Sequence, residues 1–222
     1  MKQIEKISKR IELPQRYDRN QKINLAIKQA FADSVAEFVA PMDTYVLPAY
    51  IPPISKYDDE YHEYEKGTTT TCGELPYNST TIKDGGCAVC CFKQGLAVQG
   101  YPTDLKDLAD ILGKKGYYEP GKGTWHQLFD HWGLRRATHY AEMFEALDRG
   151  TIVTALVRNI DYPGNDLETG KNFINIVGAG TDYIEQLDKK KENTFYVDDP
   201  AIGRIEFFAK DILKAIEFAW IW

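Results

Sequence analysis

The order in which two hydrophobic patterns follow one another limits the possible folds of this chain most. Up to Gly150 the apolar residues recur at intervals of three and four, and after it the chain changes to β-branched and aromatic runs. Helices that precede strands in this way predict a segregated α+β architecture. The expected helices are 20–40, 87–98, 104–115, 125–132 and 140–149. The expected strands are 151–158, 173–180, 194–199 and 204–209.

Polar residues and glycines at the segment ends predict where two of these helices start and stop. Thr103 is expected to cap the helix that follows it, and Thr124 to cap the next one. Gly133 is expected to end that second helix. The last stretch, residues 210–222, predicts a short helix whose apolar end is packed.

The first 70 residues differ from the rest of the chain. A helix there ends at Pro41, residues 41–57 are dense in proline and predict an extended strap, and an acidic linker rich in tyrosine and threonine follows. We place a boundary near Gly67–Thr71. This divides the chain into an N-terminal arm (1–70) and a domain (71–222).

Charge is distributed unevenly over these parts. The net charge is +5 in residues 1–30, −7 in residues 31–76 and −4 in residues 77–222. A basic segment followed by an acidic one predicts an arm that docks on the body of the chain or on a partner protein.

Several functional classes are not expected. With a net charge of −6 and a pI near 5.3, a nucleic-acid partner is not expected. No run approaches the roughly 18 apolar residues of a membrane span, and the start resembles no secretory signal, so we expect synthesis in the cytoplasm. The sequence contains neither a P-loop nor a dinucleotide-binding motif. Lys189–Lys191 is expected to be a solvated hairpin tip.

The four cysteines, Cys72, Cys87, Cys90 and Cys91, allow three interpretations. A zinc site would use Cys87 and Cys90 with two more ligands, such as Cys72 and a histidine, but this spacing follows no standard zinc pattern. Cys87 and Cys90 also form a C-x-x-C pair, which suits disulfide exchange at a helix start. The third interpretation is a catalytic nucleophile.

Cys87 is the candidate nucleophile because of its position. It follows Asp84-Gly85-Gly86 and opens an apolar run that predicts a buried helix, although periodicity alone also admits a strand. A helix N-terminus carries partial positive charge and outward N–H groups, which stabilise a thiolate and a neighbouring oxyanion. Cys90 and Cys91 are then expected to be inert core residues.

Several motifs, in the same order and spacing, resemble the C39-like branch of the papain-like cysteine peptidases. The resemblance covers roughly residues 75–222, and its most specific parts are a Y-x-x-x-T-I-x-x-x-G-C loop and a V-x-D-P ending. It implies a papain-like (C39-like) fold, helices first and then an antiparallel sheet. We expect no cofactor and, from the spacing of the cysteines, no metal. It also implies a cleft for a peptide or a cell-wall polymer. The motifs are YNSTTIKDGGCAVCCFKQGLA, KGTWHQLFDHWGL, ALDRGTIVTALV, GKNFINIVG and FYVDDP.

The resemblance assigns three catalytic positions. The nucleophile maps onto Cys87, and the aspartate of the D-P pair maps onto Asp199, with the adjacent Asp198 left open. The histidine that opens a central strand in the family is replaced by Asn172. Asparagine cannot accept a proton near pH 7 as imidazole does, and general-base catalysis is typically worth about 10²–10⁴-fold in rate.

The oxyanion hole and the general base both lack their usual residues. Papain-like enzymes often place a glutamine shortly before the cysteine, but there is none between Gln29 and Gln94, and Asn78 and Thr81 are the nearest polar substitutes. An active enzyme would need one of the histidines to approach Cys87. These are His62 in the linker, His126 and His131 on the Trp-rich helix, and His139 before the helix of 140–149.

Three hypotheses follow. The favoured one is a protein of this fold with a degenerate catalytic site and a binding or structural role, for example in a phage particle, with a protein partner on residues 1–70. The first alternative is an active cysteine peptidase or amidase that cleaves peptide or peptidoglycan cross-bridge bonds. The second is a C-x-x-C thiol-redox protein.

Overall fold

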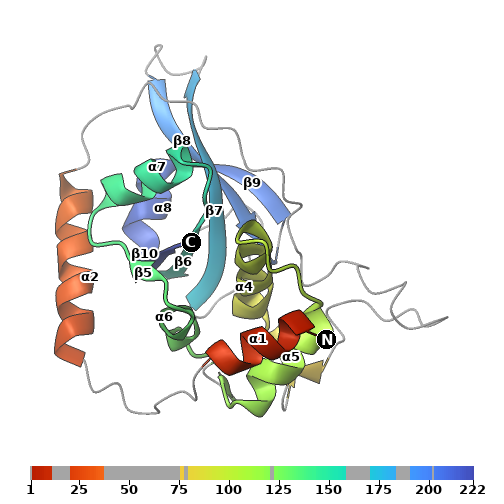
Figure 1. Cartoon of the computed structure of the whole chain (residues 1–222). Coiled ribbons are helices and arrows are strands. Elements are labelled where there is room, and N and C mark those ends of the chain that lie inside the picture. The colour runs from red at the N-terminus through yellow and green to blue at the C-terminus, as the bar shows by residue number, and fades with distance from the viewer. Residues whose placement is uncertain are drawn as a thin grey trace. The chain divides into compact units, whose positions relative to one another are not determined.

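The computed structural model describes residues 2–11, 21–37, 76–77, 80–120, 123–158, 171–183, 191–201 and 203–222 (Figure 1). These residues form helices and an antiparallel sheet, which confirms the predicted α+β class. They cluster into two compact units. Unit 1 takes its described residues from 2–11, 76–134 and 199–203, and unit 2 takes them from 21–37, 135–198 and 204–222.

Unit 1 is mainly helical, with two small two-stranded antiparallel sheets, β1–β2 and β3–β4. Its elements are α1 (Lys2–Arg10), β1 (Pro76–Tyr77), β2 (Thr80–Thr81), α3 (Ile82–Gly85), α4 (Cys87–Val98), α5 (Leu105–Lys114), β3 (Tyr118–Glu119), β4 (Gly123–Thr124) and α6 (Gln127–Trp132).

Helix α4 lies in the core of unit 1, as its continuous apolar run predicts. Phe92 of α4 is fully buried and packs edge-on against Phe129 and Trp132 of α6, each at a ring-centroid distance of 5.7 Å. Such edge-to-face aromatic pairs stabilise packing beyond the area they bury. The apolar face of α6 is therefore used to cover α4.

Both predicted helix caps are wrong. Helix α5 is capped by Asp104, whose side chain accepts hydrogen bonds from the backbone N–H groups of Lys106 at 2.8 Å and Asp107 at 3.3 Å. Asp and Thr both cap helices well, so the adjacent pair Thr103 and Asp104 could not be separated by residue type. Thr124 belongs to β4, and α6 begins only at Gln127. Gly133 does end α6 in the left-handed conformation, with φ of 94°.

Helix α1 was not predicted. Its short sequence is strongly basic, but Ile7 and Ile11 stand one turn apart and are both buried. The Lys115 ammonium group after α5 donates a hydrogen bond to the carbonyl of Ile11 at 2.6 Å, and the guanidinium of Arg10 lies 3.9 Å from the ring centre of Trp132. These tertiary contacts stabilise a helix that would be marginal alone.

Unit 2 is built on a six-stranded sheet with the strand order β5-β10-β6-β7-β8-β9. The registers of β5 with β10, β10 with β6, β6 with β7, and β7 with β8 are antiparallel. Asp199 and Gly203, at the ends of β8 and β9, cluster with unit 1. The elements are α2 (Gln21–Ala36), β5 (Arg135–Arg136), α7 (Tyr140–Asp148), β6 (Val153–Arg158), β7 (Lys171–Tyr183), β8 (Lys191–Asp199), β9 (Gly203–Phe208), α8 (Ala209–Ala215) and β10 (Ile216–Ile221).

The C-terminal prediction is half wrong. The helix α8 ends at Ala215, and the remaining apolar residues form β10, which enters the sheet between β5 and β6. Residues 217–220, a glutamate followed by three apolar residues, are buried, and so short a run has no periodicity that separates a strand from a helix. The partner strand β6 decides the outcome.

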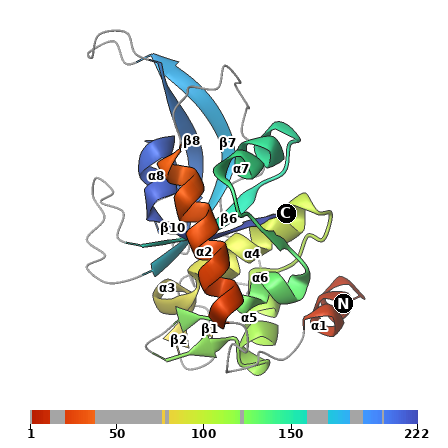
Figure 2. The same ribbon diagram turned by 90° about the vertical axis from the view of Figure 1, so that its left-hand side faces the viewer.

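Helix α2 packs against α7, α8 and β10 within unit 2 (Figure 2). Its buried Ser34 hydroxyl donates to the carbonyl of Phe31 at 2.7 Å and accepts from the N–H of Tyr140, the first residue of α7, at 3.0 Å. The predicted helix of 20–40 is thus found as Gln21–Ala36. The proline-rich strap and the boundary at Gly67–Thr71 lie outside the described residues, so the division of the chain at residue 70 stays a prediction.

The described helices include none that could cross a lipid bilayer, judged by their length and apolar character.

Candidate active site

Cys87 is the first residue of α4, the position that the nucleophile interpretation requires. Its side chain is partly exposed, whereas Cys90 and Cys91 are each 1% exposed, which confirms that these two belong to the core. Disulfides do not join these three described cysteines to one another. Within the described ranges, no group of three His, Cys, Asp or Glu residues is arranged to hold a metal ion.

The tight turn before Cys87 requires a glycine. A Cβ atom on Gly86 would lie 2.6 Å from the carbonyl oxygen of Ile82 in α3. The N–H of Gly86 instead donates to that same oxygen at 2.8 Å, which joins the end of α3 to the start of α4. This close approach, possible only without a side chain, fixes where α4 begins and so where the thiol of Cys87 stands.

Two buried hydroxyl groups also hold the turn before Cys87. The Thr124 hydroxyl donates to the carbonyl of Gly85 at 3.1 Å, so the phenol of Tyr77, 2.9 Å away, donates to Thr124. Tyr77 is fully buried, and this burial raises the pKa of its phenol, which keeps the donating proton in place. This role of Thr124 was not predicted from the sequence, where its position before an apolar run suggested a helix cap. The tyrosine of the Y-x-x-x-T-I loop was the available signal.

The candidate oxyanion donors are only partly described. The hydroxyl of Thr81, which precedes α3, donates to the carboxylate of Asp84 at 2.9 Å. Its proton is therefore directed at a neighbouring acid. Asn78 lies outside the described residues. An oxyanion role for Thr81 and Asn78 stays a prediction.

The strand register gives the faces of the sheet on which the other two predicted residues lie. Asn172 is opposite Val157 of β6, and Asn175 is opposite Asp198 of β8. Successive side chains of a strand point to opposite faces. Asn172 therefore lies on the other face of β7 from Asn175, and Asp199 lies on the other face of β8 from Asp198.

The two adjacent aspartates have different partners. Asp198, 3% exposed, forms a two-pronged ion pair with Arg204 of β9, at 2.6 Å and 2.7 Å. These hydrogen bonds raise the pKa of the Arg204 guanidinium. Asp199, 2% exposed, accepts a hydrogen bond from the N–H of Ala201 at 2.7 Å and so shapes the turn after β8. The carboxylate of Asp198 thus ties β8 to β9, which favours Asp199 as the candidate site residue.

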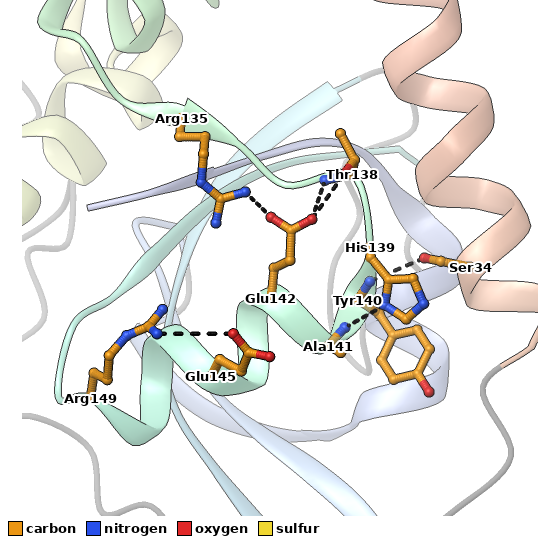
Figure 3. A network of polar contacts seen from close by, with 9 residues as sticks. All are labelled: Ser34, Arg135, Thr138, His139, Tyr140, Ala141, Glu142, Glu145 and Arg149. Atoms are coloured by element: carbon orange, nitrogen blue, oxygen red, sulfur yellow. Dashed lines mark hydrogen bonds and ion pairs between the residues drawn. The ribbon is translucent and has the colours of Figure 1, made fainter.

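Two of the described histidines, His131 and His139, form local hydrogen bonds. His131 bonds through Nδ1 to the phenol of Tyr117, and His126 stands at the N-terminus of α6. Figure 3 shows His139 at the start of α7, where its Nδ1 accepts from the N–H of Ala141 at 3.1 Å. His62 lies outside the described residues.

Comparison with known proteins supports a relation at the level of the fold. No family model matches the sequence, and no curated protein matches it. Among solved structures, the chain is similar to the crystal structure of a candidate C39-like peptidase from Bacillus anthracis, with a TM-score of 0.50 and 15% identity. The match covers 81% of this chain and 98% of the other. The fold expected from the sequence motifs is thereby confirmed, while the site assignments of Cys87, Asn172 and Asp199 remain predictions.

Proposed function

We propose that this protein keeps the C39-like peptidase fold but has a degenerate catalytic site, and that it binds a peptide or a cell-wall polymer without cleaving it. The proposal rests on the presence of Asn172 at the position where C39-like peptidases, which this sequence resembles, have the histidine that acts as general base. Asparagine neither titrates near pH 7 nor forms the charged pair that keeps a catalytic cysteine as a thiolate. The rate of thiol attack should fall accordingly.

The contacts that position the turn before Cys87 support the proposal of a preserved binding site. Gly86, Tyr77 and Thr124 hold the turn before α4 through a close backbone approach and two buried hydrogen bonds. A fold that keeps this turn while lacking the base is suited to ligand recognition. A structural role, in a phage particle for example, and a partner protein on residues 1–70 belong to the same proposal.

Hydrolysis of fluorescein-labelled casein by the full chain tests the proposal. We expect no cleavage by the wild type above the Cys87→Ser variant. Asn172→His is expected to gain Cys87-dependent cleavage, with Asn172→Gln as the matched control that adds no base. Wild-type cleavage that Cys87→Ser abolishes would establish the active-peptidase alternative and overturn the proposal.

The redox alternative is tested separately. Mild oxidation of the full chain with oxidised glutathione, followed by mass spectrometry, should leave Cys87 and Cys90 without a mutual disulfide. Ready formation of that disulfide, reversible with dithiothreitol, would favour the C-x-x-C interpretation instead.

A further inference from the structure

A buried carboxylate in unit 2 is surrounded by more positive charge than it can neutralise. The side chain of Glu217, in β10, is only 7% exposed and forms ion pairs with Lys28 of α2 at 2.8 Å and with Lys171 of β7 at 2.7 Å. A third ion pair joins it to the guanidinium of Arg158, the last residue of β6. One carboxylate therefore serves three cations that come from three different elements.

The strand register forces two of these cations together. Arg158 and Lys171 are direct partners in the β6–β7 ladder. Like charges placed directly opposite in an antiparallel pair are destabilising. Glu217 lies at the register shift between Ile216 and Phe218, and such an irregularity re-aims a side chain. The register shift therefore occurs at the residue whose carboxylate contacts both Arg158 and Lys171.

Glu217 neutralises only part of the positive charge of Lys28, Arg158 and Lys171. Within the described part of the chain, Lys28, Arg158 and Lys171 have Glu217 as their sole acidic partner. Burial, and then repulsion by Arg158, lowers the pKa of both lysines. Arg136 adds a fourth cation nearby and is a further cause of the lowered pKa of Lys28.

The cations are nevertheless within reach of a small ligand. Their side-chain exposures are 31% for Lys28, 56% for Arg158 and 49% for Lys171, in contrast to the buried Glu217. The arrangement therefore has an inner anion that belongs to the protein and an outer set of donors that is open to solvent.

We propose that Lys28, Arg158 and Lys171 bind a phosphate-type oxyanion over Glu217, either inorganic phosphate or the phosphate group of a small molecule. Three cations and one carboxylate leave two surplus positive charges, which matches the charge of about −1.5 to −2 on a phosphate monoester at pH 7. The arginine fork can donate two parallel hydrogen bonds to such a group, and each ammonium can donate more. The site does not involve Cys87 and does not depend on the proposed function.

Isothermal titration of the full chain with inorganic phosphate tests the site, with sodium chloride at equal ionic strength as the reference. We expect saturable binding of phosphate, weakened about tenfold in Arg158→Gln and in Lys171→Gln, because each loses a charged donor. Lys114→Gln is the matched control, since its ammonium pairs with Asp110 on α5, and it should bind as the wild type does. Titration with glycerol 3-phosphate then distinguishes the sources: binding of the ester extends the site to phosphorylated small molecules, and binding of the free ion alone restricts it to inorganic phosphate.

Glu217→Gln separates an anion site from a merely structural ion cluster. Removing the internal competitor is expected to tighten phosphate binding about tenfold, whereas a structural cluster would only lose stability. If this variant does not fold, the Arg158→Gln titration decides. The proposal is overturned if the wild type binds phosphate no better than chloride, or if Arg158→Gln binds it as tightly as the wild type.

Discussion

Single residues before α4 decide where the candidate nucleophile stands. Gly86 allows the backbone of α3 to approach, and Tyr77 and Thr124 hold the carbonyl of Gly85. The sequence predicted that Cys87 opens a helix, because a glycine pair precedes an apolar run. It could not predict the Tyr77–Thr124 pair, because that contact joins residues 47 positions apart.

Gly86→Ala is expected to destabilise the protein by about 1–3 kcal/mol, the usual cost of overpacking, because the new Cβ has no room against the Ile82 backbone. Urea denaturation measures the stability, and alkylation of Cys87 by iodoacetamide reports the local geometry. Gly100→Ala is the control. A Cβ atom added there meets nothing within 4 Å, but the backbone of residue 100 has a φ of 76°, so this variant introduces backbone strain without a steric clash. If Gly86→Ala leaves the rate of Cys87 labelling as unchanged as Gly100→Ala does, the close approach does not position the thiol.

Tyr77→Phe is expected to cost about 1–2 kcal/mol, because it removes a buried hydrogen bond donor to Thr124. Tyr118→Phe is the matched control, since Tyr118 is only half-buried and its ring packs on Tyr77 at 5.1 Å without the hydroxyl taking part. Thermal unfolding followed by circular dichroism compares the two. Equal melting temperatures for Tyr77→Phe and the wild type would contradict the assigned role of the phenol.

At the scale of elements, the sequence predicted the buried helix α4 and the strands β6 to β9 well, because length and residue type agree there. It failed where competing signals were close. The adjacent Thr103 and Asp104 both suit a helix cap, and the apolar run of β10 has no periodicity of its own. The cap is decided by local hydrogen bonds from the backbone N–H groups of Lys106 and Asp107 to Asp104. The strand is decided by a contact distant in sequence, the pairing of β10 with β6.

Arg204→Gln should loosen the edge of the sheet, because it leaves the carboxylate of Asp198 buried without its cation. Loss of one partner of a buried pair costs about 3 kcal/mol, and Asp198 is 3% exposed. Urea denaturation of the single variants and of Arg204→Gln/Asp198→Asn measures their coupling. The double variant should recover part of the loss; strictly additive losses would show that the pair is not coupled.

Ser34→Ala is expected to cost about 1 kcal/mol, because the N–H of Tyr140 at the start of α7 loses its hydrogen bond acceptor on α2 (Figure 3). Asp33→Ala is the control on the exposed side of the same helix. Unfolding free energies from urea melts compare them. A Ser34→Ala variant as stable as Asp33→Ala would show that this contact does not hold α2.

For the whole molecule, the net charge of −6 is a sum of opposed segments, and the most basic of them, residues 1–30, contains α1 and the first part of α2. Ile7 of α1 and Ile11, the residue after that helix, are buried in unit 1, and Phe31 of α2 is buried in unit 2. Charge patterning predicted that the arm docks on something. The charge pattern does not identify the surface on which the arm docks, because the apolar residues that pack are few and stand among many lysines and arginines.

A chain truncated before Thr71 is expected to be markedly less stable, since each of these fully buried apolar side chains is worth about 1.5–3 kcal/mol. Thermal unfolding of the truncated and full chains measures the loss. A synthetic peptide of residues 1–37 added in trans should restore part of it. A truncated chain with an unchanged melting temperature would mean that the arm serves a partner and not the fold.

Whether Cys87 lacks a general base can be measured from its rate of alkylation with iodoacetamide as a function of pH. Site-resolved mass spectrometry follows Cys87 apart from the buried Cys90 and Cys91. We expect the wild-type rate to rise with pH without rapid labelling at neutral pH, and Asn172→His to increase the rate of labelling there, because the imidazole supplies the missing partner of the thiolate. Rapid labelling of wild-type Cys87 already below pH ~6 would reveal an activated thiolate and overturn the degenerate site.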